Sequence, residues 1–178
     1  MPGQSRGAPG TPSALERFNT APAPEAERAL LACLHSARWA LLVAGHRPYP
    51  DLASLLAASD EAAYDLSPEE LAGALAAEAL PAIPADTYSA AHTALNAAHT
   101  AYETRFGHSF VICLGGVPPE ETLDRILEDI RSRLANDPDE ERAVAAEELR
   151  RLAKERLADM AEGAGSCANR RNGTAPGG

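Results

Sequence analysis

Residues 118–163 read PPEETLDRILEDIRSRLANDPDEERAVAAEELRRLAKERLADMAEG, and this stretch decides the fold class. Its apolar residues recur every three or four positions, which is the spacing of one face of an α-helix. They are Leu123, Ile126, Leu127, Ile130 and Leu134, then Val144, Leu149, Leu152 and Leu157. Helix-start signals stand at Pro118-Pro119-Glu120-Glu121 and at the capping box Asp137-Pro138-Asp139-Glu140, and Gly163 marks the final end. The stretch therefore predicts two successive amphipathic helices.

The same kinds of signal predict helices in the first half of the chain. One helix is expected over residues 24–44, ended by Gly45, and Asp51 should cap a short helix that follows. Ser67-Pro68-Glu69-Glu70 is a capping box with proline at the first helical position. Its helix should stop near residues 80–84, because two prolines interrupt that stretch.

The middle of the chain carries one further helix signal and one β-like run. Asp86 should cap a helix over residues 87–105, and Gly107 should end it. Phe110-Val111-Ile112-Cys113-Leu114 is short and has no visible partner strand, so we expect a buried extended segment instead of a sheet. The sequence thus predicts an all-α, single-domain helical bundle with one short buried extended segment.

Composition sets the limits of the folded domain. Residues 1–16 and 163–178 are rich in glycine, proline, serine and alanine, and we expect both to be disordered tails. The folded domain should then span residues 17–162.

Charge and cysteine content exclude several classes of protein. The formal charge of −10 gives no electrostatic footprint for nucleic acid or an anionic membrane. No apolar run approaches the roughly 20 residues that a membrane span needs. Cys33, Cys113 and Cys167 cannot all pair within one chain and form no CxxC spacing, so we expect a cytoplasmic protein.

A series of short motifs then carries a resemblance to one family. The motifs are Phe18-Asn19, Ser36 to Trp39, Arg47-Pro48, Tyr102-Glu103-Thr104-Arg105-Phe106-Gly107 with Phe110, Arg133-Leu134-Ala135-Asn136-Asp137, Glu141, Glu148-Leu149 and Arg156-Leu157. In this order, the chain resembles the 2-oxo-4-hydroxy-4-carboxy-5-ureidoimidazoline (OHCU) decarboxylases over about residues 18–158. The resemblance implies an all-α bundle, usually a homodimer, that uses neither metal nor organic cofactor. It also implies a small-molecule substrate, the unstable intermediate of urate oxidation, which loses carbon dioxide to give S-allantoin.

The sequence departs from the family where its first catalytic motif, His-Pro-Arg-Ile-Gly, should stand. The nearest stretch is residues 80–84, with Leu80 at the histidine position and Ala82 at the arginine position. An alignment shifted by two residues puts Glu78 at the histidine position and still supplies no imidazole. Glu78 is therefore open to two interpretations, as a displaced carboxylate in the pocket or as an exposed residue at a helix end.

The second family motif, Ser-x-x-Glu-Gln, is also incomplete. Ser89 matches its serine, but His92 and Thr93 stand where glutamate and glutamine should be. The resemblance implies that Arg156 helps hold the polar ring of the substrate. It also implies that the segment from Phe110 through Ile112 to Cys113 lines the pocket. Ser89 and His108, the latter at the turn beside that segment, complete the set of predicted binding residues.

Candidate replacements for the missing catalytic groups lie on one helix. Ser89, His92, Asn96, His99 and Glu103 are spaced by three or four residues and share a face. His92 or His99 could take over proton transfer, with Glu103 orienting the imidazole; the alternative is a solvated face that happens to hold two histidines. A metal site is not expected, because about two helical turns, roughly 10 Å, separate the two histidines.

Three hypotheses about function follow. The first is a cofactor-independent OHCU-decarboxylase-like carboxy-lyase with a degenerate active site. The second is an enzyme repurposed on the same scaffold for another small polar or carboxylated substrate, as in secondary metabolism. The third is a non-catalytic relative that binds a ligand or a partner protein.

Overall fold

The computed structural model describes residues 10–83 and 89–163, and helices are the only regular elements there. In chain order they are α1 (Ala14–Thr20), α2 (Ala23–Cys33), α3 (Ala37–Gly45), α4 (Leu52–Tyr64), α5 (Pro68–Ala76), α6 (Ser89–Phe106), the 3₁₀ turn η1 (Pro119–Glu121), α7 (Thr122–Arg133) and α8 (Pro138–Glu162). The prediction of an all-α fold is confirmed. No described helix combines the length and the apolar character that crossing a membrane requires.

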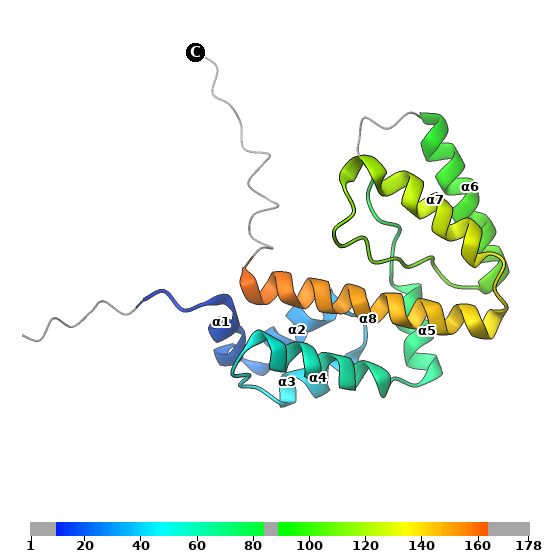
Figure 1. Cartoon of the computed structure of the whole chain (residues 1–178). Coiled ribbons are helices and arrows are strands. Elements are labelled where there is room, and N and C mark those ends of the chain that lie inside the picture. Colours follow the sequence, from blue (N-terminus) through cyan, green and yellow to red (C-terminus); the bar gives the residue numbers. More distant parts are fainter. Residues whose placement is uncertain (1–9, 84–88, 164–178) are drawn as a thin grey trace, which may run out of the picture.

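Helix α8 runs through the middle of the molecule and organises it (Figure 1). Helices α1, α2, α4 and α5 pack against α8, and α3 joins α2 and α4. Their buried side chains and those of α8 form the larger of two hydrophobic clusters. Helices α6 and α7 pair with each other apart from α1–α5 and enclose the smaller cluster (Figure 1).

The extended segment, residues 110–114, separates these two clusters. It adopts no regular secondary structure, as the sequence predicts, and its first three residues are buried. Val111 belongs to the larger cluster, whereas Phe110 and Ile112 belong to the smaller one. Successive side chains of an extended chain point to opposite sides, so this short run contributes to both clusters at once.

Several predicted helix ends are confirmed by their caps. The Ser67 hydroxyl accepts from the Glu70 N–H at 3.2 Å, and the Glu70 carboxylate accepts from the Ser67 N–H at 2.8 Å, which completes the capping box of α5. Asp51 caps α4 by accepting from the Ser54 N–H at 2.8 Å. Gly163 closes α8 with a φ of 80°, a left-handed conformation that favours glycine.

The predicted single helix over residues 24–44 is wrong, because the chain forms two helices there. Leu34 has extended backbone angles, and the Ser36 hydroxyl accepts from the Trp39 N–H at 3.3 Å. Ser36 therefore caps a new helix, α3, instead of continuing α2. The break leaves the Cys33 carbonyl without a partner in the helix, and it accepts from the Arg156 guanidinium at 3.0 Å.

Helix α1 begins at Ala14, inside the range 1–16 that the sequence assigns to the N-terminal tail. Its start is a capping box in which the Ser13 hydroxyl accepts from the Glu16 N–H and the Glu16 carboxylate accepts from the Ser13 N–H. The composition around Ser13 is typical of a disordered tail, but Ser13 with Glu16 three residues later also fits a helix start. Residues 1–9 and 164–178 of the predicted tails lie outside the described residues.

Two other helix limits differ from the predictions, and a third is not tested. Helix α5 ends at Ala76, short of the prolines at residues 81 and 84. The segment opened by Pro119 begins as a 3₁₀ turn before α7. Helix α6 is described from Ser89, and its predicted cap, Asp86, lies outside the described residues.

A buried polar network joins the α6–α7 pair to α8. The Glu141 carboxylate, with no exposed surface, accepts from Arg133 Nε at 2.8 Å and Nη2 at 2.6 Å, and from Asn136 Nδ2 at 2.9 Å. It also accepts a hydrogen bond from the Tyr102 hydroxyl. Arg133 Nη1 donates to the Val111 carbonyl at 2.6 Å. These contacts compensate the burial of both charges and tie α6, α7 and the extended segment to the first turn of α8.

Candidate functional site

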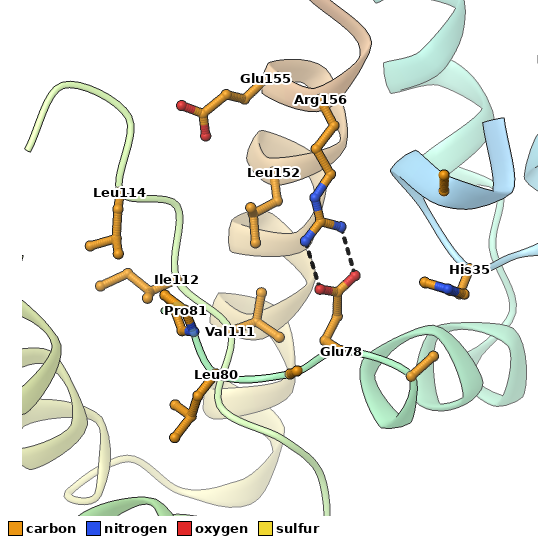
Figure 2. Close-up of a pocket in the computed structure, with 13 residues that line it drawn as sticks. His35, Glu78, Leu80, Pro81, Val111, Ile112, Leu114, Leu152, Glu155 and Arg156 are labelled. Carbon is orange, nitrogen blue, oxygen red and sulfur yellow. Dashed lines mark hydrogen bonds and ion pairs between the residues drawn. The ribbon is translucent and has the colours of Figure 1, made fainter. Parts of the chain in front are cut away.

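A cavity of about 560 Å³ opens where the chain after α5, the extended segment and α8 meet (Figure 2). The α2–α3 connector forms its remaining side. The lining residues are Ala32, His35, Ala77, Glu78, Ala79, Leu80, Pro81, Val111, Ile112, Leu114, Leu152, Glu155 and Arg156. This volume suits a small organic ligand.

An ion pair between Glu78 and Arg156 crosses this cavity (Figure 2). Arg156 Nη1 and Nη2 donate to the two Glu78 carboxylate oxygens at 2.9 and 2.8 Å. The Glu78 side chain is 5% exposed and that of Arg156 33% exposed, so the pair stands at the edge of the solvent. The hydrogen bonds to Glu78 raise the pKa of Arg156 above its usual value, so the guanidinium is charged throughout the physiological range.

The local sequence explains how these two side chains meet. The capping box starts α5, and the helix ends at Ala76, so Glu78 follows directly and turns inward. Leu152, Glu155 and Arg156 are three and four residues apart, which puts them on one face of α8. That face is turned toward the chain after α5 and the extended segment (Figure 2).

A second carboxylate, Glu155, lies on the same side of the cavity as Leu114 (Figure 2). The Cys113 thiol donates to Glu155 Oε2 at 3.3 Å, and the Cys113 N–H donates to Glu148 Oε2 at 2.8 Å. Burial is the largest cause that raises the pKa of the Cys113 thiol, which favours the neutral form. Glu155 approaches the chain so closely that a Cβ at Gly115 would meet its Oε1 at 2.8 Å, so a larger residue there would make the Glu155 side chain shift.

Among the described residues, His35 is the only histidine that lines this cavity, and it lies in the connector between α2 and α3. It lies on the far side of the Glu78–Arg156 pair from Ile112 and Leu114 (Figure 2). The described lining therefore carries one guanidinium, two carboxylates and one imidazole. Such a set can hydrogen-bond a polar ring and can exchange protons with it.

Of the predicted binding residues, Arg156 and Ile112 line the cavity. Phe110 does not, because its ring packs edge-on against Tyr102 in the smaller cluster, with the ring centroids 5.1 Å apart. Cys113 is occupied by the two carboxylates of α8 and stands behind the lining. His108 lies against the Phe106 ring, with centroids 6.3 Å apart, and is likewise outside the lining.

Of the predicted catalytic residues on α6, His99 and Glu103 lie close together, but away from this cavity. His99 Nε2 is 3.7 Å from Glu103 Oε1, as an i, i+4 pair. Glu103 Oε1 also accepts from the Ser109 hydroxyl at 3.2 Å. His92 and Ser89 lie on the same helix, and none of the four α6 residues is among those lining the cavity. The functional interpretation of this face therefore requires a ligand site other than the Arg156 cavity.

Two polar lining residues, His35 and Glu155, are absent from the sequence prediction. The signal for Glu155 was available, because it follows Leu152 and precedes Arg156 on the same helical face. His35 has no such signal, because the sequence predicts one long helix over residues 24–44 with His35 in its interior. Among the described residues no group of three or more histidine, cysteine, aspartate or glutamate side chains is placed to hold a metal ion.

Comparison with known proteins identifies the family to which the chain belongs. The sequence model of the family described as OHCU decarboxylase matches the chain over residues 19–83 and 82–158. The chain belongs to the OHCU decarboxylase family. A 2-oxo-4-hydroxy-4-carboxy-5-ureidoimidazoline decarboxylase from Amia calva is 39% identical over 66 residues, which cover 37% of this chain and 35% of that relative.

Solved structures share the fold. A crystal structure of (S)-allantoin synthase aligns with a TM-score of 0.67 at 19% identity, over 84% of this chain and 54% of that one. A crystal structure of OHCU decarboxylase in the presence of (S)-allantoin aligns with a TM-score of 0.62 at 19% identity, over 73% of this chain and 94% of that one. The chain thus spans about half of the first structure and about a third of the Amia calva relative.

Proposed function

We propose that this protein is a cofactor-independent, OHCU-decarboxylase-like carboxy-lyase whose active site is degenerate. The site is the cavity between α5, the extended segment and α8. The observation that carries this proposal is the position of Arg156, which lines the cavity at the place where the family resemblance expects a ring-binding arginine. The family membership of the chain supports the reaction class.

The chemistry asks for two things from the protein. Loss of carbon dioxide leaves an electron pair that spreads onto the carbonyl groups of the ring, so a fixed hydrogen-bond donor stabilises the transition state. A proton must then reach one face only, which calls for a positioned acid. Arg156 can supply the first function. For the second, the cavity offers His35 and Glu155 in place of the family motif.

Two residues that line the cavity support the proposal that the active site is degenerate. Leu80 and Pro81, the residues that resemble the start of the His-Pro-Arg-Ile-Gly motif, are both in the lining. Leu80, which stands at the histidine position of that motif by sequence resemblance, contributes an aliphatic side chain that cannot move a proton. The two matched segments of the family also meet at residues 82–83, within this motif.

A coupled assay tests the proposal. Urate is converted by the two upstream enzymes to the unstable ureidoimidazoline, this protein is added, and S-allantoin is followed by circular dichroism. We expect stereoselective formation above the spontaneous rate, but about a hundred- to ten-thousand-fold slower than with a family enzyme that has both motifs. A rate equal to that of such an enzyme would show that the site is not degenerate.

Two variants of α8 give the assay its control. Arg156→Leu should remove the acceleration, whereas Arg151→Leu should leave it unchanged, because Arg151 is exposed and pairs only with Glu147 and Glu148 among the described residues. Decay of wild type to racemic product at the spontaneous rate would favour the non-catalytic relative, which binds a ligand or a partner without turnover.

A second candidate is an enzyme repurposed on the same scaffold for another small polar or carboxylated substrate. The polar groups His35 and Glu155 favour it, because they are placed in the cavity apart from either family motif. Genes for urate oxidase and hydroxyisourate hydrolase beside the coding gene would favour the family reaction, and other neighbours would favour this alternative.

The proposal includes a homodimer in the cytoplasm. The family resemblance supports the dimer, and the unpaired cysteine count supports a reducing compartment. Light scattering coupled to size-exclusion chromatography should give about twice the mass of the chain, 18.7 kDa.

A further inference from the structure

Glu78 is already paired with Arg156, the cationic side chain that a carboxylated ligand would need in this cavity. Both Arg156 Nη atoms donate to its carboxylate, and the Glu78 side chain is only 5% exposed. A carboxylate and a guanidinium joined by two hydrogen bonds form one of the stronger pairings among side chains. A ligand carboxylate must therefore displace Glu78 or bind beside it.

The hydrogen bonds of Arg156 leave one edge of the guanidinium open. Nη1 uses its two hydrogens on Glu78 and on the Cys33 carbonyl, and Nη2 uses one on Glu78. Within the described part of the chain, Nε–H and the second Nη2–H donate to no acceptor. In a planar guanidinium these two N–H groups lie side by side and point the same way. They can bind one carbonyl oxygen or two adjacent acceptors.

The open edge faces the body of the cavity. Nη1 points to the Cys33 carbonyl at the end of α2, so the opposite edge, with Nε and Nη2, points away from α2. In Figure 2 the extended segment, with Ile112 and Leu114, lies on that other side of the pair, and so does Glu155. A ring carbonyl placed between Arg156 and Ile112 would thus meet two donors whose positive charge Glu78 already balances.

The net charge of the residues that line the cavity also disfavours binding of an anionic ligand. Glu78 and Glu155 contribute two carboxylates and Arg156 one guanidinium, so the lining is negative by one unit when His35 is uncharged. A second carboxylate brought to Arg156 would come close to both glutamates. Like charges at such short range oppose binding.

We propose that Glu78 determines the specificity of this cavity: it selects a neutral ring carbonyl, as in a cyclic ureide, over a carboxylated ring. The inference rests on the proposed function, because it concerns the ligand of the same site. It also predicts slow turnover in the family reaction, since the substrate of that reaction carries a carboxylate. Removal of the Glu78 charge should shift the preference toward carboxylated ligands.

Calorimetric titration with two probes that share one ring tests this inference. Hydantoin is the neutral probe and hydantoin-5-acetate the carboxylated one. Wild type should bind hydantoin more tightly than hydantoin-5-acetate. In Glu78→Gln, affinity for hydantoin-5-acetate should rise about tenfold or more, because a charged acceptor gains the freed guanidinium. Affinity for hydantoin should change less than about twofold.

Two further variants make the result decisive. Glu78→Ala removes the carboxylate with a different side-chain volume and should shift the preference in the same direction. Glu155→Gln removes the cavity's other negative charge without freeing Arg156, and it should raise affinity for hydantoin-5-acetate far less than Glu78→Gln. Equal gains in the two glutamine variants would overturn the assignment to Glu78, and so would tighter wild-type binding of the carboxylated probe.

The outcomes also separate this inference from the proposed function. Binding of either probe that is lost in Arg156→Leu, but insensitive to Glu78→Gln, would refute the role of Glu78 and keep the site. Absence of binding by both probes to wild type and to all variants, with each still folded by far-ultraviolet circular dichroism, would refute the site and the inference together.

Discussion

Glu141 is a carboxylate with no exposed surface, and its neighbours account for its burial. Arg133, Tyr102 and Asn136 all donate to it. Removing one member of such a pair leaves the other charge buried without compensation. Glu141→Gln should therefore lower the free energy of unfolding by about 3–5 kcal/mol. Urea denaturation of both proteins measures the difference.

The neighbouring Glu140 provides the control for this prediction. It is exposed in the same first turn of α8, so Glu140→Gln should change the free energy of unfolding by less than about 0.5 kcal/mol. Equal losses in the two variants would show that Glu141 acts only through the charge of the first turn, not through the buried network.

Cys33 should resist alkylation in the native protein. Burial is the main cause that raises the pKa of its thiol to about 11, from 9.0, although nearby Arg156 acts in the opposite direction. Near pH 8 the native thiolate fraction is then about a hundredfold lower than in the unfolded chain. The native state holds this proton more tightly, so the associated stability is full below pH 9 and is lost as the pH rises toward 11.

Peptide mapping by mass spectrometry after a short exposure to iodoacetamide checks this prediction. Cys33 should be modified at least about ten times more slowly in buffer than in urea. Similar rates in the two conditions would mean that the end of α2 opens freely, and the contact between the Cys33 carbonyl and Arg156 would then be in doubt.

At the scale of elements, α5 matters because its last residues lead directly to Glu78. Its capping box satisfies two backbone N–H groups that would otherwise lack partners. Ser67→Ala should cost about 1 kcal/mol of unfolding free energy in chemical denaturation. The exposed Ser132 in α7 caps no helix, so Ser132→Ala should cost almost nothing. Equal losses of unfolding free energy in Ser67→Ala and Ser132→Ala would show that the capping box does not stabilise α5.

The cap of α4 predicts a pH dependence of stability. Hydrogen bonds from Ser54 lower the pKa of the Asp51 carboxyl below its usual 3.8. A carboxyl with a lowered native pKa stabilises the folded state above its unfolded pKa, and that contribution disappears as the pH falls below about 4. Asp51→Asn should therefore lose less stability than wild type between pH 6 and pH 3. Thermal unfolding at the two pH values measures this, and equal losses would contradict the prediction.

Sequence reasoning located most elements because their ends carry strong local chemistry. Ser67, Asp51 and Gly163 are each recognisable without any knowledge of the fold. The break between α2 and α3 could not be predicted in this way. Ser36 is compatible with a helix interior as well as with a cap, and what favours the break is distant. Arg156, far along the chain, donates to the carbonyl that the break releases at Cys33.

The candidate site also contains some residues that the sequence predicts and others that it does not. Arg156 and Ile112 could be predicted, because the family resemblance names their positions. The pairing of Glu78 with Arg156 could not, since nothing local in either segment indicates that they meet. The face of α6 with His92 and His99 has a regular spacing, but spacing alone does not say which surface of the bundle it occupies.

His99→Ala and His92→Ala should leave the decarboxylation rate in the coupled assay unchanged if the Arg156 cavity is the site.

At the scale of the whole molecule, α6 and α7 form a pair with a small core of its own. In the part of the chain that the structure describes, the smaller cluster has six buried residues, against twenty-one in the larger one. A unit with less buried apolar surface opens at a lower free energy. Amide hydrogen exchange should therefore be faster in α6 and α7 than in the middle of α8. Slower exchange in α6 than in α8 would contradict this view of the two clusters.

The cavity lies where these two parts meet, and its walls belong to both. Leu80 packs against the smaller cluster and Leu152 against the larger one, and both line the cavity beside Arg156. A ligand that touches both walls favours the closed arrangement over any opened one, and its apparent affinity is reduced by the fraction of molecules that are open. Glu141, far from the cavity along α8, would then tune ligand affinity without contacting the ligand. We therefore expect that loosening the network that anchors α6 and α7 weakens ligand binding at the cavity.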